Sequence, residues 1–257
     1  MPNRTIIWLL SGVALFIAAL APPALAQQPS DEESKLFDEQ AQKYFGAAQL
    51  AGYDATLKSI ASDLAAREQQ VIAATRFARF FLDYARVAKT DADFKALELM
   101  YPRFKAATNA IMEAGAAAAK GLASKGLDKE ITFIDGQLYK LLGDPKMRAV
   151  FMTWEAGILA PYGTTPARAA TLLDAKPELA QSAIAAMINA PEKVRDRLEK
   201  IEPKDVGKYA EGLGDMIFGV GTVVSDVLSA RKISLKPIFS IGTGLKQFGE
   251  GWGKFFG

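Results

Sequence analysis

The chain contains no cysteine and no histidine, and each absence excludes a class of chemistry. Without cysteine there is no disulfide framework, thiol nucleophile, iron–sulfur cluster or thiolate zinc site. Without histidine there is no histidine-based catalytic triad, imidazole metal ligand or histidine pH switch. The net charge is small as well, since 31 basic and 29 acidic residues give +2. The chain therefore lacks the excess of basic residues that non-specific nucleic-acid binding requires. With 50% hydrophobic residues, the 257-residue chain is too apolar to be disordered.

Residues 1–26 have the features of a secretory signal peptide. Arg4 supplies a basic start, and the apolar run over residues 6–20 has the length of a signal core. Two prolines then end any helix, and Ala24-Leu25-Ala26 is the small-x-small pattern that signal peptidase reads. We expect cleavage after Ala26 and a periplasmic or secreted mature protein. The alternative, an uncleaved anchor, is disfavoured because the run is short for a bilayer span of about 20 residues.

The remaining sequence predicts an all-α fold: a multi-helix bundle with long N-terminal helices, several short proline-initiated helices and a glycine-rich C-terminal helical hairpin. Ser30 and Glu33 form a capping box that starts a helix over residues 31–45. Heptad spacing of apolar residues predicts a long helix over about 54–88, after breaks at Gly46 and Gly52. We divide the mature chain into a helical domain over 27–203 and a C-terminal hairpin over 204–257.

Proline marks most of the other expected helix boundaries. It is favoured in the first helical turn, because backbone N–H groups there have no hydrogen-bond partner within the helix and proline, which lacks an N–H, loses none. The prolines that precede a helix-like stretch are Pro102, Pro145, Pro166, Pro177, Pro191, Pro203 and Pro237. An alanine-rich segment over residues 106–119 indicates a face for close helix packing.

Catalytic signals are few. The chain has no nucleophile elbow, no Walker A loop and no EF-hand loop. A pair of carboxylates is able to act as acid and base without histidine, but no spacing selects one pair. The candidates are Glu113, Asp128, Glu130, Asp135 and Glu155. We therefore assign no catalytic residue, no cofactor and no metal ligand from the sequence, and interpret these side chains as solvated helix ions.

The last fifty residues differ in composition, because eleven of the 21 glycines lie between Gly207 and Gly257. The pattern G-x-G-x-x-x-F-G-x-G occurs twice there, thirty residues apart. Its glycines are Gly212, Gly214, Gly219 and Gly221 in the first copy and Gly242, Gly244, Gly249 and Gly251 in the second. We predict that they allow close helix packing, because small residues let helix axes approach.

An apolar stripe with helical spacing follows Pro237. It consists of Ile238, Ile241, Leu245, Phe248, Trp252 and Phe255, and Lys246 and Lys254 lie away from it. This pattern is typical of an amphipathic helix. One interpretation is a hairpin that buries the stripe against itself, with the glycines facing each other. The other is contact with a membrane or partner, with the lysines near anionic headgroups. The two are compatible if the hairpin opens.

Our leading hypothesis is a non-enzymatic periplasmic or secreted helical protein that acts by protein–protein or membrane-surface contact through its C-terminal segment. The partner is an unknown protein or a membrane surface, nucleic acid is excluded by the charge balance, and the oligomeric state stays open. Two alternatives remain: a periplasmic carrier of an apolar ligand within the bundle, and a hydrolase or lyase that uses a carboxylate pair.

Overall fold

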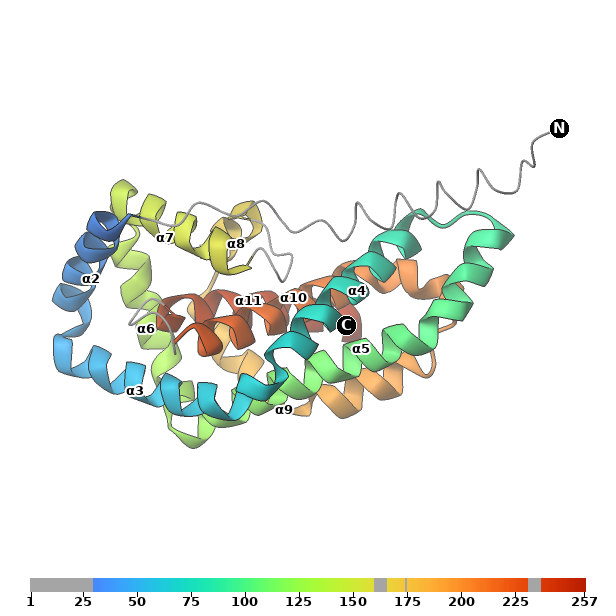
Figure 1. Ribbon diagram of the computed structural model, residues 1–257, viewed down its shortest axis with the longest axis horizontal. Coiled ribbons are helices and arrows are strands. Elements are labelled where there is room, and N and C mark those ends of the chain that lie inside the picture. The colour runs from blue at the N-terminus through green and yellow to red at the C-terminus, as the bar shows by residue number, and fades with distance from the viewer. Residues whose placement is uncertain (1–29, 160–165, 174, 231–236) are drawn as a thin grey trace.

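The computed structural model describes residues 30–159, 166–173, 175–230 and 237–257, and these are helical with no β-strand among them (Figure 1). The prediction of an all-α multi-helix bundle is confirmed. The expected signal peptide over 1–26 lies outside the described residues.

The first two expected helices are partly as predicted. α2 (Asp31–Phe45) begins at the capping box: Ser30 Oγ accepts from the Glu33 N–H at 3.3 Å, and Glu33 Oε2 accepts from the Ser30 N–H at 2.8 Å. Gly46 then adopts a φ of 78°, a conformation that favours glycine, and ends the helix. The single helix expected over 54–88 is wrong. The chain forms α3 (Ala47–Leu64), a 3₁₀ turn (Ala65–Arg67) and α4 (Glu68–Val87) instead.

The later helices follow in short succession: α5 (Asp91–Ser124), α6 (Leu127–Leu141), α7 (Pro145–Leu159), α8 (Pro166–Leu173), α9 (Pro177–Leu198), α10 (Val206–Ser229) and α11 (Pro237–Phe256). Pro203 opens a 3₁₀ turn (Pro203–Asp205) that leads into α10. The helix starts predicted at Pro102 and Pro191 are wrong, because both lie inside helices. Proline removes one backbone donor there, but the helices continue through it.

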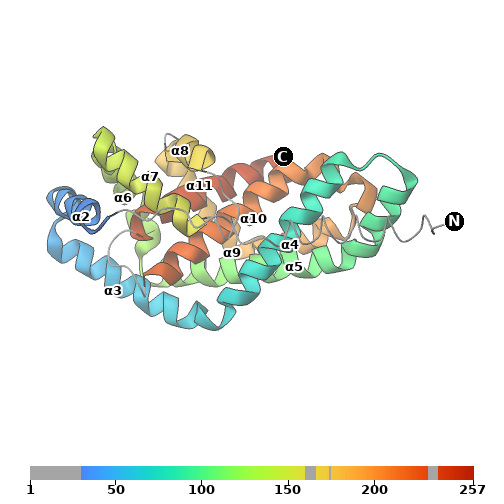
Figure 2. The same cartoon turned by 45° about the horizontal axis from the view of Figure 1, so that its top comes forward.

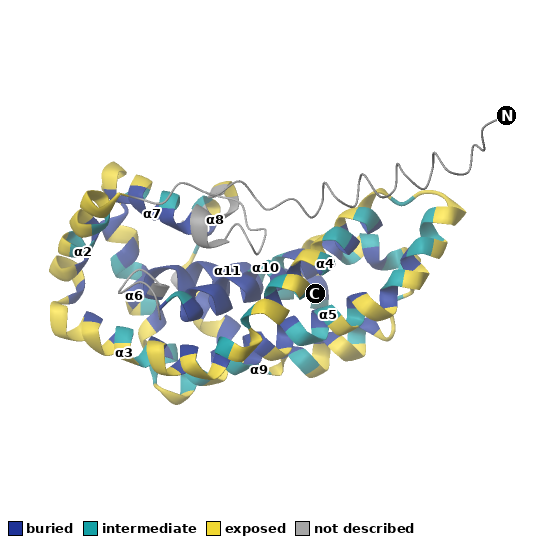
Figure 3. Ribbon diagram, in the orientation of Figure 1, coloured by how far each residue is buried: buried dark blue, intermediate teal, exposed yellow. Residues whose placement is uncertain are grey.

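The C-terminal hairpin lies at the centre of the bundle. α10 and α11 run side by side, α10 packs on α3, α4, α5 and α7, and α11 packs on α6, α8 and α9 (Figures 1 and 2). We call the helices around the hairpin, α3 to α9, the sheath. Figure 3 shows the contrast: α10 and α11 are mostly buried, whereas the sheath helices carry exposed residues on their outer sides.

Small residues of α5 allow the sheath to approach the hairpin closely. Ala114, Ala118 and Ala119 are fully buried. Gly115 lies against Val220 of α10, and a Cβ at that position would be 3.4 Å from the Val220 Cβ. The alanine-rich segment is therefore a packing face over its C-terminal half.

Candidate functional site

The two helices of the hairpin meet backbone to backbone at four glycines. Gly212 and Gly219 lie seven residues apart on α10, and Gly244 and Gly251 lie seven apart on α11. A Cβ on Gly219 would be 2.5 Å from the Phe248 N and 2.7 Å from the Gly244 O, distances that no real Cβ adopts. A Cβ on Gly251 would likewise be 2.6 Å from the Gly212 O. The close approach of α10 and α11 thus requires glycine at these positions.

The other glycines of the repeat have different surroundings. Gly242 faces α6, where a Cβ would be 2.8 Å from Asp135 Oδ1, and Gly249 faces α9, where a Cβ would be 3.0 Å from Leu179 Cδ1. Gly214 has only ordinary contacts, the nearest at 3.6 Å from Arg86, and Gly221 is buried in α10. The repeat therefore combines glycines for the hairpin contact with glycines that face the sheath.

The apolar stripe of α11 faces the interior of the bundle. Its buried members are Ile238, Ile241, Leu245, Phe248 and Phe255, whereas Trp252 is half-buried. A membrane or a partner therefore reaches the stripe only if α11 leaves the sheath.

The two lysines predicted for contact both have carboxylate partners within the protein. Lys254 bridges to α10, with Nζ 2.7 Å from Glu211 Oε1 and 2.8 Å from Asp215 Oδ2. Lys246 is 0% exposed, and its Nζ lies 2.6 Å from Asp135 Oδ2 of α6. The expectation that α11 has one apolar and one solvent-facing side is wrong at Lys246, because the counter-charge on α6 allows the lysine to be buried.

The Asp135–Lys246 ion pair joins the hairpin to the sheath. Burial raises the pKa of Asp135, and the adjacent Lys246 offsets part of the rise. A void of about 10 Å³ beside the pair, lined by Asp135, Phe239 and Gly242 among others, holds at most one water molecule. The pair is therefore almost completely shielded from solvent.

A second buried polar cluster joins α7 to the hairpin. Glu155 of α7, Asp226 of α10 and Ser240 of α11 are all 0% exposed. None of the four carboxyl oxygens has a hydrogen bond of regular geometry. Burial raises the pKa of Glu155 well above its usual range, and the neighbouring Asp226 raises it further. Burial likewise raises the pKa of Asp226, and the Ser240 hydroxyl offsets only part of each rise.

The remaining carboxylate candidates lie elsewhere. Glu113 is exposed on α5, where it accepts a hydrogen bond from Asn109 Nδ2 at 3.0 Å. Asp128 and Glu130 belong to the first turn of α6, and Glu130 accepts from the Tyr53 hydroxyl at 3.1 Å. The carboxyl group near Glu155 is that of Asp226, which the sequence analysis did not select. Its position within an apolar helix is the one sequence feature that marks it.

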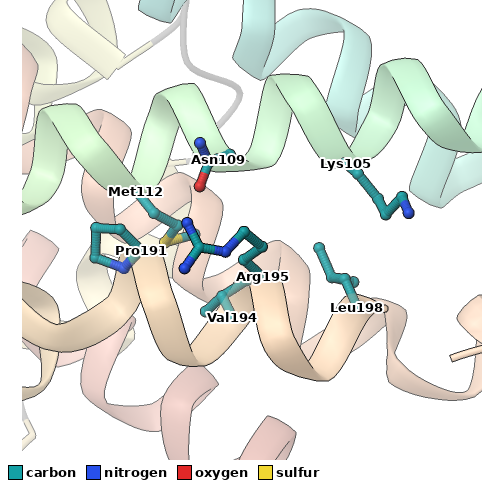
Figure 4. Close-up of a pocket in the computed structure, with 7 residues that line it drawn as sticks. All are labelled: Lys105, Asn109, Met112, Pro191, Val194, Arg195 and Leu198. Carbon is teal, nitrogen blue, oxygen red and sulfur yellow. The ribbon is translucent and has the colours of Figure 1, made fainter. Parts of the chain in front are cut away.

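Two hollows of the described surface differ in size. The one in Figure 4, between α5 and α9, has a volume of about 10 Å³ and is lined by Met112, Pro191 and Arg195 among others. A larger open hollow of about 420 Å³ lies between α3 and α6, and its lining is about equally polar and apolar, with Gln49, Lys125 and Leu127 among its residues. Among the described residues, no group of three or more acidic side chains is placed to hold a metal ion.

Comparison with protein-family models, curated proteins and solved structures gives no match.

Proposed function

We propose that this protein is exported to the periplasm or secreted and acts without catalysis by contact with a membrane. The contact element is the α10–α11 hairpin, which leaves the sheath to enter the bilayer. The signal sequence expected over residues 1–26 would deliver the mature chain to a compartment bounded by membrane.

The observation that carries this proposal is the length of the buried hairpin together with the apolar composition of α10. The segment Pro203–Ser229 has a mean hydropathy of 1.3 over its best window, and 83% of that window is buried inside the bundle. The 24 residues of α10 correspond to about 36 Å of helix, enough to cross a hydrocarbon core about 30 Å thick. The 20 residues of α11 correspond to about 30 Å, so α11 matches the core in length, but its composition includes Lys246, Glu250 and Lys254.

The glycine contacts favour transfer of the hairpin as one unit. Helices in lipid associate through small residues that bring their backbones together. Gly212, Gly219, Gly244 and Gly251 already provide such an interface between α10 and α11. Because this interface lies within the hairpin, it does not have to be broken when the hairpin separates from the sheath.

A core helix that never leaves a water-soluble bundle has similar length and composition. A covalent tether between hairpin and sheath distinguishes such a fixed hairpin from one that leaves the sheath. Deletion of residues 231–257 would not distinguish them, because it removes a central helix. The tether is Ala183→Cys with Gly249→Cys, which joins α9 to α11 where the two Cβ atoms would be 3.4 Å apart. This distance is close to that of natural disulfides, about 3.5–4.5 Å.

The matched control is Ile60→Cys with Gly121→Cys, which joins α3 to α5 within the sheath at a Cβ separation of 3.5 Å. Both pairs are placed in the mature chain, which has no other thiol. Dye release from vesicles rich in anionic lipid is measured for the oxidised and the reduced forms.

We expect the mature chain and the oxidised control to release dye. The oxidised α9–α11 tether should release none, and reduction should restore its activity. No release by the untethered chain, or equal release by the oxidised α9–α11 tether and the control, would refute the proposal.

A further inference from the structure

The buried pair Glu155 and Asp226 lies where α7 meets the hairpin, and the described residues around it supply no compensating cation. Both residues are 0% exposed, and so is the adjacent Ser240 on α11. None of the four carboxyl oxygens has a regular hydrogen bond, and no described lysine or arginine forms an ion pair with either group. A buried carboxylate without a counter-charge is very unfavourable, so the pair must be held in another form.

The charged groups near the pair can be named helix by helix. The group from α10 that acts on Glu155 of α7 is Asp226, and α11 contributes the uncharged Ser240. Lys246 of α11 is engaged by Asp135 of α6. Of the described residues of α3, α4, α5, α8 and α9, none contributes a charge that acts on either carboxyl. Because no cation among the described residues acts on the pair, protonation is the way to neutralise it.

We propose that Glu155 and Asp226 form a proton-binding latch between the hairpin and α7. In the docked form both carboxyls are protonated, and when the hairpin separates from α7 each O–H bond breaks, the proton passes to water and a hydrated carboxylate remains. The latch rests on the proposed function only in treating the separated hairpin as the active form.

The direction of the effect follows from the burial of both groups. Because burial raises the pKa of each carboxyl, the docked form binds more protons than the open form above about pH 4, where exposed carboxyls ionise. Low pH therefore holds the hairpin in place, and rising pH releases it. The opening equilibrium constant increases about tenfold per pH unit for each proton released.

A single thiol on α9 reports the separation directly. Ala183 is 2% exposed and packs against Gly249 of α11, so Ala183→Cys should react with a thiol reagent only when α9 and α11 separate. The labelling rate of the native mature chain is divided by that of the urea-unfolded chain at the same pH, which removes the titration of the thiol itself. The measurement spans pH 5 to 7.5 and contains no lipid.

We expect the protection of the thiol to fall as pH rises over this range, by up to about tenfold per pH unit for each proton released. Glu155→Gln and Asp226→Asn, each alone in the Ala183→Cys chain, should each reduce this slope. Glu113→Gln, which removes an exposed carboxyl of α5, should leave it unchanged.

Three results would overturn the latch. One is protection that is independent of pH, and another is an unchanged slope in both variants, which would assign the protons to another group such as Asp135. The third is protection that rises with added Mg²⁺ or Ca²⁺ in the parent but not in the variants, which would assign the pair to a cation. Because no lipid is present, these results stand apart from failure of the vesicle experiment.

Discussion

Replacing Gly219 by alanine tests the backbone contact between α10 and α11. The new Cβ would lie 2.5 Å from the Phe248 N and 2.7 Å from the Gly244 O. Because both neighbours are backbone atoms of α11, no side chain can rotate away and the helices must move apart. Such overpacking costs about 1–3 kcal/mol or more, whereas alanine gains about 1 kcal/mol over glycine in a helix. The difference is a net loss of up to about 2 kcal/mol, or more, in the free energy of unfolding.

Two other glycines of the hairpin serve as controls for the same chemical change. Gly253 of α11 has no atom within 4 Å of an added Cβ, and Gly214 of α10 has only contacts of 3.6 Å or more. Alanine at Gly253 should stabilise the protein by about 0.5–1 kcal/mol, and alanine at Gly214 should be close to neutral. Urea unfolding followed by circular dichroism gives all three values. If Gly219→Ala is as stable as Gly253→Ala, the backbone contact does not exist as described.

Three further predictions concern the sheath and its contacts. Asp135→Asn should cost about 3–5 kcal/mol because it leaves the Lys246 charge buried alone, whereas Asp135→Leu with Lys246→Met should be nearly neutral; equal urea midpoints for the two variants would contradict this. Burial raises the pKa of Tyr101 to about 12, and its hydroxyl donates to the Leu198 O at 2.6 Å. Stability should therefore fall as pH rises from about 10 to 12, and Tyr101→Phe should reduce that dependence in urea unfolding at each pH, with Tyr53 and Tyr84, whose pKa values burial also raises, contributing to the remainder. Thr90→Ala removes the cap of α5, in which the Asp93 N–H donates to Thr90 Oγ1 at 3.2 Å, and should lower stability by about 1 kcal/mol, with Thr90→Ser retaining most of it.

The fold class and several helix starts could be predicted because they depend on local chemistry. The capping box at Ser30 involves four consecutive residues, and Pro145 and Pro177 begin helices because proline suits the first turn. The break at residues 65–67 could not be predicted in the same way. The heptad spacing continues through it, with Arg67 as the one charged position of the seam, so periodicity alone favours one helix over two.

The candidate site was located by its glycine content, but its polar contacts depend on residues distant in the chain. Lys246 has the spacing of a solvent-facing residue, and only the arrival of Asp135 from α6 makes its burial favourable. The meeting of Glu155 with Asp226 likewise depends on how α7 crosses α10. Pairing of this kind leaves no periodic signal, because each partner is a single residue on a helix distant in the sequence from that of the other.

The central position of the hairpin also determines when the molecule is able to fold. A ribosome makes the N-terminal residues first, so α2 to α9 emerge before the two helices around which they pack. Until α10 and α11 appear, the inward faces of α4, α5 and α9 lack the hairpin against which they pack. We therefore expect nascent chains that stop before Val206 to be protease-sensitive, and the completed chain to become resistant in one step. A bundle whose central helices are synthesised after those that surround them cannot complete its core until the central helices have emerged.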